Sequence, residues 1–183
     1  MSEPVEIWVV PLDPPEAELR RLYGSLSPEE RERAGEPPFA PRKRRYVARQ
    51  GAVREILARY TGVRPERVGL VRTNLGKPMV AGRAAPRFSV SDSGDLALVA
   101  IAQCEVGVDL EEVRRRPAAP LGTRAFFERW TRMEATGKAL GNGLFRRGPA
   151  GRPLACASLD VGRGFAAAVA VEADGVDVRL RPY

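Results

Sequence analysis

Histidine is absent from this chain of 183 residues, and cysteine occurs at only two positions, Cys104 and Cys156. Without histidine, any proton transfer must fall to a carboxylate, a lysine or water. The two cysteines are too few for a disulfide scaffold and lack the spacing of metal ligands. Cys104 lies among apolar residues and is expected to be a small core residue. We therefore expect a reducing compartment, the cytoplasm.

Long hydrophobic runs are also missing. The apolar stretches at 96–102 and 165–171 are far shorter than the about 20 residues that a membrane-spanning helix needs. Glu3, Pro4 and Glu6 break the charged-then-apolar pattern of a signal peptide. We therefore expect no membrane association. Hydrophobic residues make up 44% of the chain, which excludes a mainly disordered protein and allows one ordinary core or two small ones.

The chain is strongly basic, with a net charge of +7 and a pI of about 10.1. Most of the positive charge is arginine, clustered at 42–45, 114–116 and 146–147. Such a balance favours an anionic partner, which could be nucleic acid, a nucleotide cofactor or an acidic protein. The arginine content also fits a GC-rich coding sequence that carries no functional meaning.

Turn and capping residues divide the chain into short elements. The Ser-Pro-Glu-Glu run at 27–30 forms a capping box that starts a helix. Pro41 opens a longer helix that reaches about residue 60 and ends at Gly62. The Ser-Gly-Asp run at 93–95 predicts a hairpin turn. The other expected elements are a helix at 123–140 and strands at 5–12, 68–73, 88–91, 96–102, 105–110, 154–161, 165–171 and 176–180.

A weak internal repeat links two of these segments. Residues 92–102 and 160–170 are each a turn followed by a strand of small apolar residues. The repeat suggests an α+β fold of two pseudo-symmetric halves, each a small antiparallel sheet packed with a helix. We expect the boundary near Cys104, which gives an N-terminal half at 1–104 and a C-terminal half at 105–183.

Two short segments place acidic residues together. Asp109 and Glu111 lie two apart in an expected strand and so share one face. Glu134 and Lys138 lie four apart in an expected helix and also share a face. Three carboxylates and a lysine in one pocket would suit Mg²⁺ with substrate phosphates. Taken singly, each pair also fits a solvated surface pair or a modest helix-stabilising pair.

The order of the motifs resembles that of the surfactin-type phosphopantetheinyl transferases, over about residues 27–171. The matching segments are a basic helix at 45–54, Gly-Lys-Pro at 76–78, Phe-x-x-Ser-x-Ser at 88–93, Gly-x-Asp-x-Glu at 107–111, Trp-x-x-x-Glu-Ala-x-x-Lys at 130–138 and Gly-x-Gly at 141–143. Each motif alone is weak, but their common order makes the resemblance strong.

The resemblance implies both a fold and an activity. Members of this family look like two pseudo-symmetric halves with coenzyme A between them, which makes a monomer sensible. They transfer the 4′-phosphopantetheine arm of coenzyme A to a serine of an acyl or peptidyl carrier protein and release 3′,5′-ADP. Carrier proteins are typically acidic, which suits a basic partner.

The resemblance also implies roles for individual residues. Asp109, Glu111 and Glu134 would hold Mg²⁺ against the pyrophosphate. Glu134 would also accept the proton of the carrier serine, and Lys138 would contact the same phosphates. The positions that match the coenzyme-binding residues of the family are Arg45, Lys77, Ser91 and Asp92.

The chain departs from the family pattern at three places. Asp92 replaces a histidine that would lie near the 3′-phosphate of the coenzyme, where a carboxylate repels phosphate unless an arginine such as Arg45 or Arg87 pairs with it. Met133 replaces a lysine beside Glu134, and the segment between Glu112 and Trp130 is short, which affects carrier docking.

Two other functions stay open at this point. A degenerate relative would keep the fold, with coenzyme or carrier binding, but would not catalyse transfer. A basic nucleic-acid-binding module would explain the arginine clusters, although the sequence has no basic stripe interleaved with aromatic residues. We therefore expect no nucleic-acid partner.

Overall fold

The computed structural model describes residues 2–82, 85–113, 123–141 and 153–183, and it has an α+β fold. The helices are α1 (Glu16–Gly24), α2 (Pro28–Ala34), α3 (Pro41–Thr61), a short 3₁₀ helix (Pro65–Arg67) and α4 (Thr123–Ala139). The strands are β1 (Ser2–Pro11), β2 (Leu70–Arg72), β3 (Pro78–Val80), β4 (Arg87–Ser93), β5 (Leu96–Ala102), β6 (Val106–Glu112), β7 (Ala155–Leu159), β8 (Phe165–Val171) and β9 (Gly175–Pro182).

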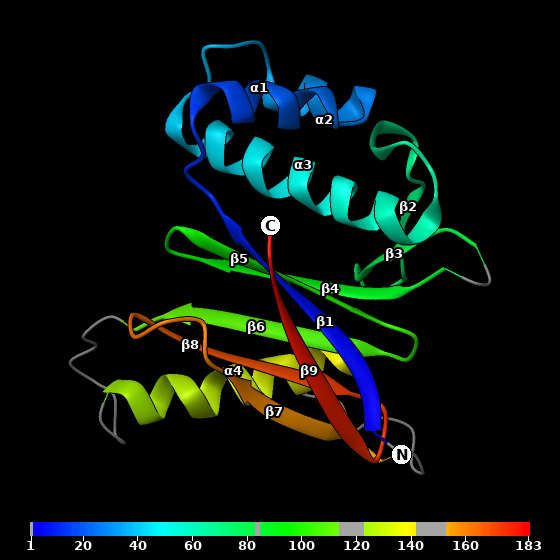
Figure 1. Ribbon diagram of the computed structural model, residues 1–183, viewed down its shortest axis with the longest axis vertical. Helices are drawn as coiled ribbons and strands as arrows, with labels where there is room; N and C mark the ends of the chain where they lie inside the picture. The colour runs from blue at the N-terminus through cyan, green and yellow to red at the C-terminus, as the bar shows by residue number, and fades with distance from the viewer. Residues whose placement is uncertain (1, 83–84, 114–122, 142–152) are drawn as a thin grey trace.

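The elements form stacked layers, visible from top to bottom in Figure 1. Helices α1, α2 and α3 cover a first sheet with strand order β4-β5-β1-β9, and α4 covers a second sheet with order β6-β8-β7. The inner faces of the two sheets meet in a shared core that includes Ile7 and Leu98 from the first sheet and Val108 and Val169 from the second.

The two halves repeat one topology. In the N-terminal half the repeated elements are β1, α3, β4 and β5, in chain order, with other short elements between them. Strand β5 lies between β1 and β4 and is antiparallel to both. In the C-terminal half the chain runs β6-α4-β7-β8, and β8 lies between β6 and β7, again antiparallel to both. The internal repeat in the sequence therefore corresponds to the middle strands β5 and β8 and the turns before them.

The first sheet departs from the expected purely antiparallel arrangement. Strand β9 belongs to the C-terminal part of the chain, yet it pairs in parallel with β1 of the N-terminal half, and Figure 1 shows the two strands running side by side. The pairing runs from Ser2 with Gly175 to Val9 with Pro182. The division at 104/105 stays a prediction, because the C-terminal strand completes the N-terminal sheet.

Local sequence signals account for several element boundaries. Ser27 accepts a hydrogen bond from the backbone of Glu30 and Glu30 accepts one from Ser27, so the predicted capping box of α2 is confirmed. Gly62 ends α3 in the left-handed conformation, with φ of 67°. Gly94 has φ of 61° in the predicted hairpin turn between β4 and β5.

Helix α1 and strand β3 were not expected from the sequence. The N-terminus of α1 follows Pro15 and has no side-chain cap, so it lacks the usual start signal. The helix is stabilised by tertiary packing: Leu19 and Leu22 belong to the buried core, and Leu22 lies directly against α3 at Gly51. Among the described residues, no helix is both long enough and apolar enough to cross a membrane.

Candidate active site

Strand β6 presents a row of alternating residues to α4: Gly107, Asp109 and Glu111. Side chains two apart on a strand share a face, and Gly107 marks the face that touches the helix. A Cβ atom added at Gly107 would lie 2.0 Å from the carbonyl oxygen of Ala135 and 2.4 Å from the backbone nitrogen of Ala139. Glycine therefore lets α4 lie directly on β6, which brings the helix side chains beside the two carboxylates.

Asp109 is buried at the centre of this contact, with 5% of the residue exposed. Its Oδ1 atom accepts hydrogen bonds from Ser91 Oγ at 2.9 Å and from Lys138 Nζ at 2.7 Å. Within the described residues, the Oδ2 atom is buried and has no hydrogen-bond partner. A buried carboxylate oxygen in this state carries a desolvation cost that a bound cation would offset.

Glu134 and Lys138 approach Asp109 from α4. Lys138 also donates to the carbonyl oxygen of Val108 at 3.1 Å, and Glu134 lies one turn earlier on the helix. Burial and the negative charges of Asp109 and Glu111 raise the pKa of Glu134, while Lys138 lowers it. The three carboxylates therefore repel one another, and the lysine offsets only part of that repulsion.

The donor set fits a hard divalent cation such as Mg²⁺, which prefers carboxylate oxygens and water. The fit rests on the unpartnered Oδ2 of Asp109 and on the excess negative charge near Glu134. In the parts of the chain that the structure describes, no three acidic side chains lie close enough together to hold a metal ion as they stand. Binding would therefore require Glu111 and Glu134 to close on Asp109.

The end of β4 meets the first turns of α3 beside this cluster. Asp92 accepts a hydrogen bond from Arg49 Nη1 at 2.8 Å, and Arg45 donates to the carbonyl oxygen of Gly94. The expected pairing of Asp92 with an arginine is thus confirmed, but the arginine is Arg49 and neither Arg45 nor Arg87, the two examples named from the sequence. Arg45 and Arg49 lie one helical turn apart, so the two side chains reach successive positions along the same edge.

Lys77 and Arg87 lie at the other end of β6. Lys77 Nζ is 2.7 Å from Glu105 and donates to the carbonyl oxygen of Val106 at 3.1 Å, and Arg87 is 3.1 Å from Glu105. Val106 precedes Asp109 by three residues, which corresponds to roughly 10 Å along a strand. Lys77 therefore lies outside the carboxylate cluster, although Lys77 and Lys138 donate to backbone carbonyl oxygens on the same edge of β6.

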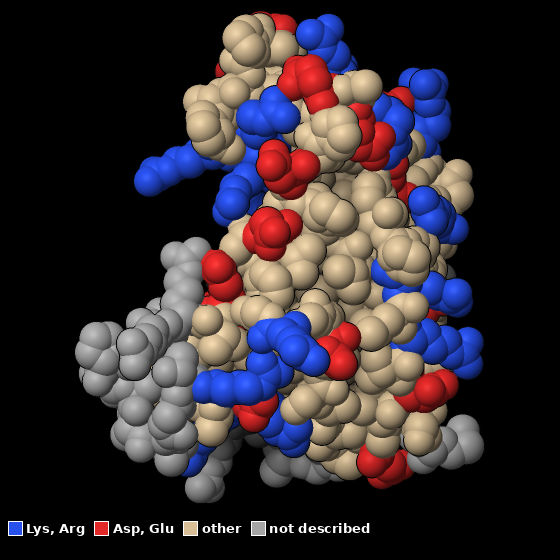
Figure 2. All heavy atoms as spheres, turned by 60° about the vertical axis from the view of Figure 1, so that its left-hand side comes forward, with Lys and Arg blue, Asp and Glu red and all other residues tan. Residues whose placement is uncertain are grey.

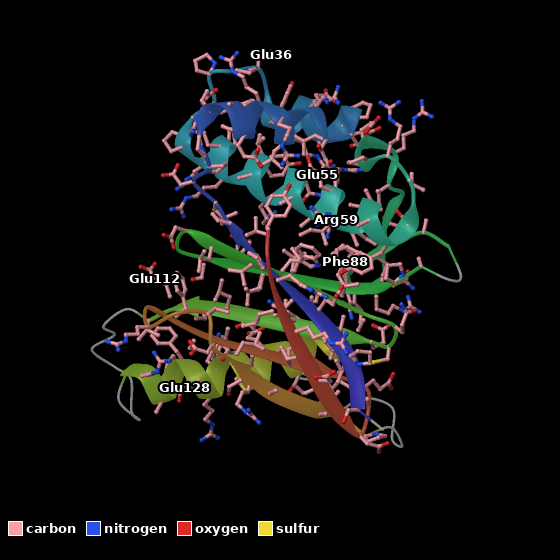
Figure 3. All side chains as sticks on the ribbon, viewed as in Figure 1. Glu36, Glu55, Arg59, Phe88, Glu112 and Glu128 are labelled. Carbon is pink, nitrogen blue, oxygen red and sulfur yellow. The ribbon has the colours of Figure 1, made fainter. Side chains whose placement is uncertain are left out.

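Positive and negative side chains intermix on the face of the molecule in Figure 2. Figure 3 shows Glu112 at the end of β6 nearest the β4–β5 turn and Glu128 on the outer side of α4. The side chain of Glu128 is 48% exposed and pairs with Arg124 at 2.9 Å. Among the described residues on the face in Figure 2, carboxylates interrupt the positive charge, which does not form the continuous basic stripe typical of nucleic-acid binding.

Comparison with known proteins decides the family. No protein-family model matches the chain. The chain is 34% identical to the 4′-phosphopantetheinyl transferase HetI of Nostoc sp. over 79% of its own length and 71% of that protein. It is 32% identical to a phosphopantetheinyl transferase of Thraustochytrium sp. over 78% of its own length and 55% of that protein. The chain belongs to the phosphopantetheinyl transferase family.

A phosphopantetheinyl transferase is an enzyme that transfers the phosphopantetheine group to carrier proteins, so the nucleic-acid-binding alternative is not supported. The structure brings together Ser91, Asp109 and Lys138 through hydrogen bonds, with Glu134 and Glu111 close enough to interact electrostatically. Met133 lies beside Glu134 and is 45% exposed. Residues 114–122 of the short segment before α4 and residues 142–143 of the Gly-x-Gly motif lie outside the described residues.

Sequence reasoning missed the partner of Asp92, which is Arg49, and the hydrogen bonds that Ser89 and Ser93 make to β6. The alternation of serine at 89, 91 and 93 was a usable signal, because it places the three hydroxyl groups on one face of a strand. No such signal in the sequence distinguishes Arg45 from Arg49 as the partner of Asp92, since both lie on the same face of α3.

Proposed function

We propose that the contact between β4, β6 and α4 is the catalytic site, and that it transfers 4′-phosphopantetheine from coenzyme A to a serine of an acidic carrier protein with Mg²⁺. The observation that carries the proposal is the buried, unpartnered Oδ2 atom of Asp109, with Glu134 and Lys138 beside it on α4. The family membership supports the reaction, and the carboxylates support the metal.

Asp109, Glu111 and Glu134 would hold the metal ion. When bound, Mg²⁺ would neutralise negative charge on the phosphate under attack and on the departing phosphate. Burial and the negative charges of Asp109 and Glu111 raise the pKa of Glu134, and a bound cation would compensate those charges. A bound cation would explain why Glu111 and Glu134 lie near the buried Asp109, since three carboxylates without a cation repel one another.

Glu134 is the proposed general base and Lys138 the group that stabilises the leaving phosphate. The serine oxygen of the carrier forms a bond to the phosphorus next to the pantetheine arm, and its proton passes to Glu134. The bond from that phosphorus to the bridging oxygen breaks, and 3′,5′-ADP leaves with the electron pair. A carboxylate can take up such a proton directly or through water. Lys138 offsets charge on the leaving group.

For the nucleotide part of coenzyme A, the proposed contacts are Arg45, Lys77 and Asp92, whereas the Ser91 hydroxyl group hydrogen-bonds to Asp109 and Lys138. Arg45 is the best candidate to bind a phosphate, because its side chain is exposed and, within the described residues, its guanidinium contacts only the backbone carbonyl of Gly94 in the β4–β5 turn. Asp92 is neutralised by Arg49 at 2.8 Å, which removes part of the repulsion that a free carboxylate would exert on phosphate.

The charge of the chain bears on its partner, and its two halves bear on its assembly. A basic chain with a net charge of +7 favours an acidic carrier protein. Two halves in one chain make a monomer sufficient to form the site. A cytoplasmic location stays a prediction of the sequence, consistent with Cys104 and Cys156, which are not joined in a disulfide.

Intact-mass spectrometry of apo carrier proteins, incubated with coenzyme A, Mg²⁺ and this enzyme, tests the proposal. We expect a mass gain of one phosphopantetheine arm that is lost when the metal is chelated and in Glu134→Gln. Glu128→Gln is the matched control, because Glu128 lies on the same helix but faces solvent and pairs with Arg124. Transfer that persists in Glu134→Gln at the rate of the control would contradict the assigned role.

A further inference from the structure

Three serines alternate along β4 and face β6: Ser89, Ser91 and Ser93. Strands β4 and β6 are edge strands of different sheets, so the two halves meet here without a shared ladder of backbone hydrogen bonds. Side chains bridge the gap instead. Because alternate residues of a strand share one face, the three hydroxyl groups point across the boundary in register with β6.

Each hydroxyl has its own partners on β6 or α4. Ser89 Oγ accepts from the backbone nitrogen of Val108 at 3.1 Å. Ser91 Oγ donates to Asp109 Oδ1 at 2.9 Å and accepts from Lys138 Nζ at 3.1 Å.

The third serine bonds to both backbone and carboxylate. Ser93 Oγ donates to Glu111 Oε2 at 3.4 Å and accepts from the backbone nitrogen of Glu112 at 3.0 Å. Two of the three serines therefore touch the two carboxylates of β6 that the proposed function assigns to the metal, one serine to each carboxylate.

We propose that Ser91 and Ser93 are positioning residues that orient Asp109 and Glu111 for metal binding, so that the N-terminal half controls the geometry of a metal site built on the C-terminal half. The inference rests on the proposed function, because it takes the two carboxylates as metal ligands. It assigns Ser91 a role different from coenzyme contact, the role that the resemblance implied.

The geometry at Asp109 explains how Ser91 acts. Ser91 and Lys138 together occupy Oδ1, which leaves Oδ2 as the oxygen available to a cation. Ser91 is only 9% exposed, so water cannot readily replace its hydroxyl group. Without that hydrogen bond the carboxylate can rotate about its terminal bond, and a ligand that must first be ordered binds the metal less tightly. Hydrogen bonds that orient metal ligands are typically worth about 10- to 100-fold in affinity.

Ser89 provides the matched comparison. It lies on the same strand and the same face, is buried to a similar degree at 5% exposure, and also bridges the two halves. Its hydroxyl group bonds to the backbone of Val108 and so supports β6 without touching a carboxylate. A purely structural role for the serines would affect Ser89→Ala and Ser91→Ala alike.

The test is binding of Mn²⁺, followed by the electron paramagnetic resonance signal of the free ion, to the enzyme saturated with coenzyme A. We expect Ser91→Ala to weaken Mn²⁺ binding by about tenfold and Ser93→Ala by less, because its contact is longer. Ser91→Thr, which keeps the hydroxyl group, should restore most of the affinity. Ser89→Ala should bind as the wild type does, whatever its thermal stability.

Two results would overturn the inference while leaving the proposed function intact: unchanged Mn²⁺ affinity in Ser91→Ala, or an equal loss in Ser89→Ala. Absence of Mn²⁺ binding by the wild type in the presence of coenzyme A would instead refute the metal site of the proposed function, and this inference with it. Thermal unfolding of each variant confirms that the binding measurements are made on folded protein.

Discussion

The two halves share a strand order but differ in how closely the helix lies on its sheet. In the N-terminal half, large side chains such as Ile56, Leu57 and Phe88 fill the space between α3 and the sheet. In the C-terminal half, the last turns of α4 meet the sheet through a cluster of small buried residues, Ala135, Ala139, Ala168 and Ala170, although Phe127 is buried nearer the start of the helix. The closer helix is the one whose side chains reach the carboxylates of the strand beneath it. Tight packing in the C-terminal half is therefore part of the proposed active site.

The halves also differ in charge where they meet. The N-terminal half contributes Arg45 and Arg49 at the end of β4, and the C-terminal half contributes Asp109 and Glu134 with Lys138. Two copies of one topology thus supply opposite charges to a common boundary. A ligand with both phosphates and a divalent cation has groups that complement each side.

Replacing Gly107 by alanine is the largest change that this comparison predicts. The added Cβ would lie 2.0 Å from the carbonyl oxygen of Ala135, so α4 must move away from β6. We expect the free energy of unfolding to fall by about 3 kcal/mol or more. Denaturant unfolding measures the loss, and metal-dependent transfer by the folded fraction should fall with it.

Gly24→Ala is the control for this substitution, because a Cβ at Gly24 meets nothing within 4 Å. It should leave stability unchanged or slightly higher. Equal stabilities for Gly107→Ala and wild type would mean that the position of α4 does not depend on its close contact with β6. Such a result would contradict the proposed difference in packing between the two halves.

Lys138→Met should have the next largest effect. It removes the positive charge 2.7 Å from Asp109, whose side chain is 7% exposed, and Ser91 then remains as the one side-chain donor to that carboxylate among the described residues. We expect the free energy of unfolding to fall by about 2 kcal/mol, because the buried carboxylate of Asp109 loses its positively charged partner. Transfer should fall by about 100-fold through the lost stabilisation of the leaving phosphate.

Lys77→Met is the matched control for Lys138→Met. Lys77 also donates to a carbonyl oxygen of β6, but its carboxylate partner, Glu105, keeps Arg87 at 3.1 Å. Stability should therefore change little. If the free energy of unfolding falls by the same amount in both variants, the burial of Asp109 does not make its lysine partner more important for stability than that of Glu105.

Asp92→Asn sharpens the charge comparison. The change releases Arg49 from its 2.8 Å contact and removes one negative charge from the N-terminal side of the boundary. If the nucleotide phosphates lie there, the KM for coenzyme A should fall about fivefold with kcat unchanged, as expected for one charge-assisted contact near the surface. Steady-state kinetics against coenzyme A measure it. Asp95→Asn in the next turn is the control, and an equal effect there would indicate only a general charge effect.

The smallest predicted effect concerns the end of β9, which ties the C-terminus to the N-terminal half. Glu55 on α3 accepts hydrogen bonds from Tyr183 at 2.7 Å, from Ser25 at 2.6 Å and from Arg21. Burial alone would raise the pKa of Glu55, but these three donors together lower it. A carboxyl group with a lowered pKa in the folded state stabilises the protein above its unfolded pKa, and this contribution is lost as the pH falls through the folded value.

Thermal unfolding of wild type and Glu55→Gln at two pH values tests this contribution. At pH 7 the variant should unfold about 2–4 °C lower, equivalent to about 1 kcal/mol for a chain of this size. At a pH well below the folded pKa, where Glu55 is protonated, the difference should disappear. Asp177→Asn on β9, where the Arg179 pair is exposed, should show no difference at either pH. A pH-independent difference for Glu55→Gln would argue against the ionised network.

Much of the fold was predictable because its signals are local. The capping box at Ser27, the left-handed Gly62 and the turn at Gly94 each act within a few residues, and each was found where expected. The parallel pairing of β9 with β1 was not predictable, because it joins residues at opposite ends of the chain, for example Ser2 and Gly175. No local pattern encodes such a partner.

The same distinction between local and long-range signals holds for the candidate site. The alternation of Asp109 and Glu111 and the helical spacing of Glu134 and Lys138 predicted which side chains share a face. The distance between strand and helix depends on Gly107 and the alanines of α4, and the sequence alone does not give it. The hydrogen bonds across the boundary likewise require the tertiary structure.

The most direct test of the central claim is anomalous diffraction from Mn²⁺ in crystals grown with coenzyme A. The account predicts an anomalous peak within coordination distance of Asp109 Oδ2, with Glu111 and Glu134 closed around it and the pyrophosphate between the metal and Lys138. Ordered coenzyme A whose pyrophosphate and metal lie away from these three carboxylates would contradict it.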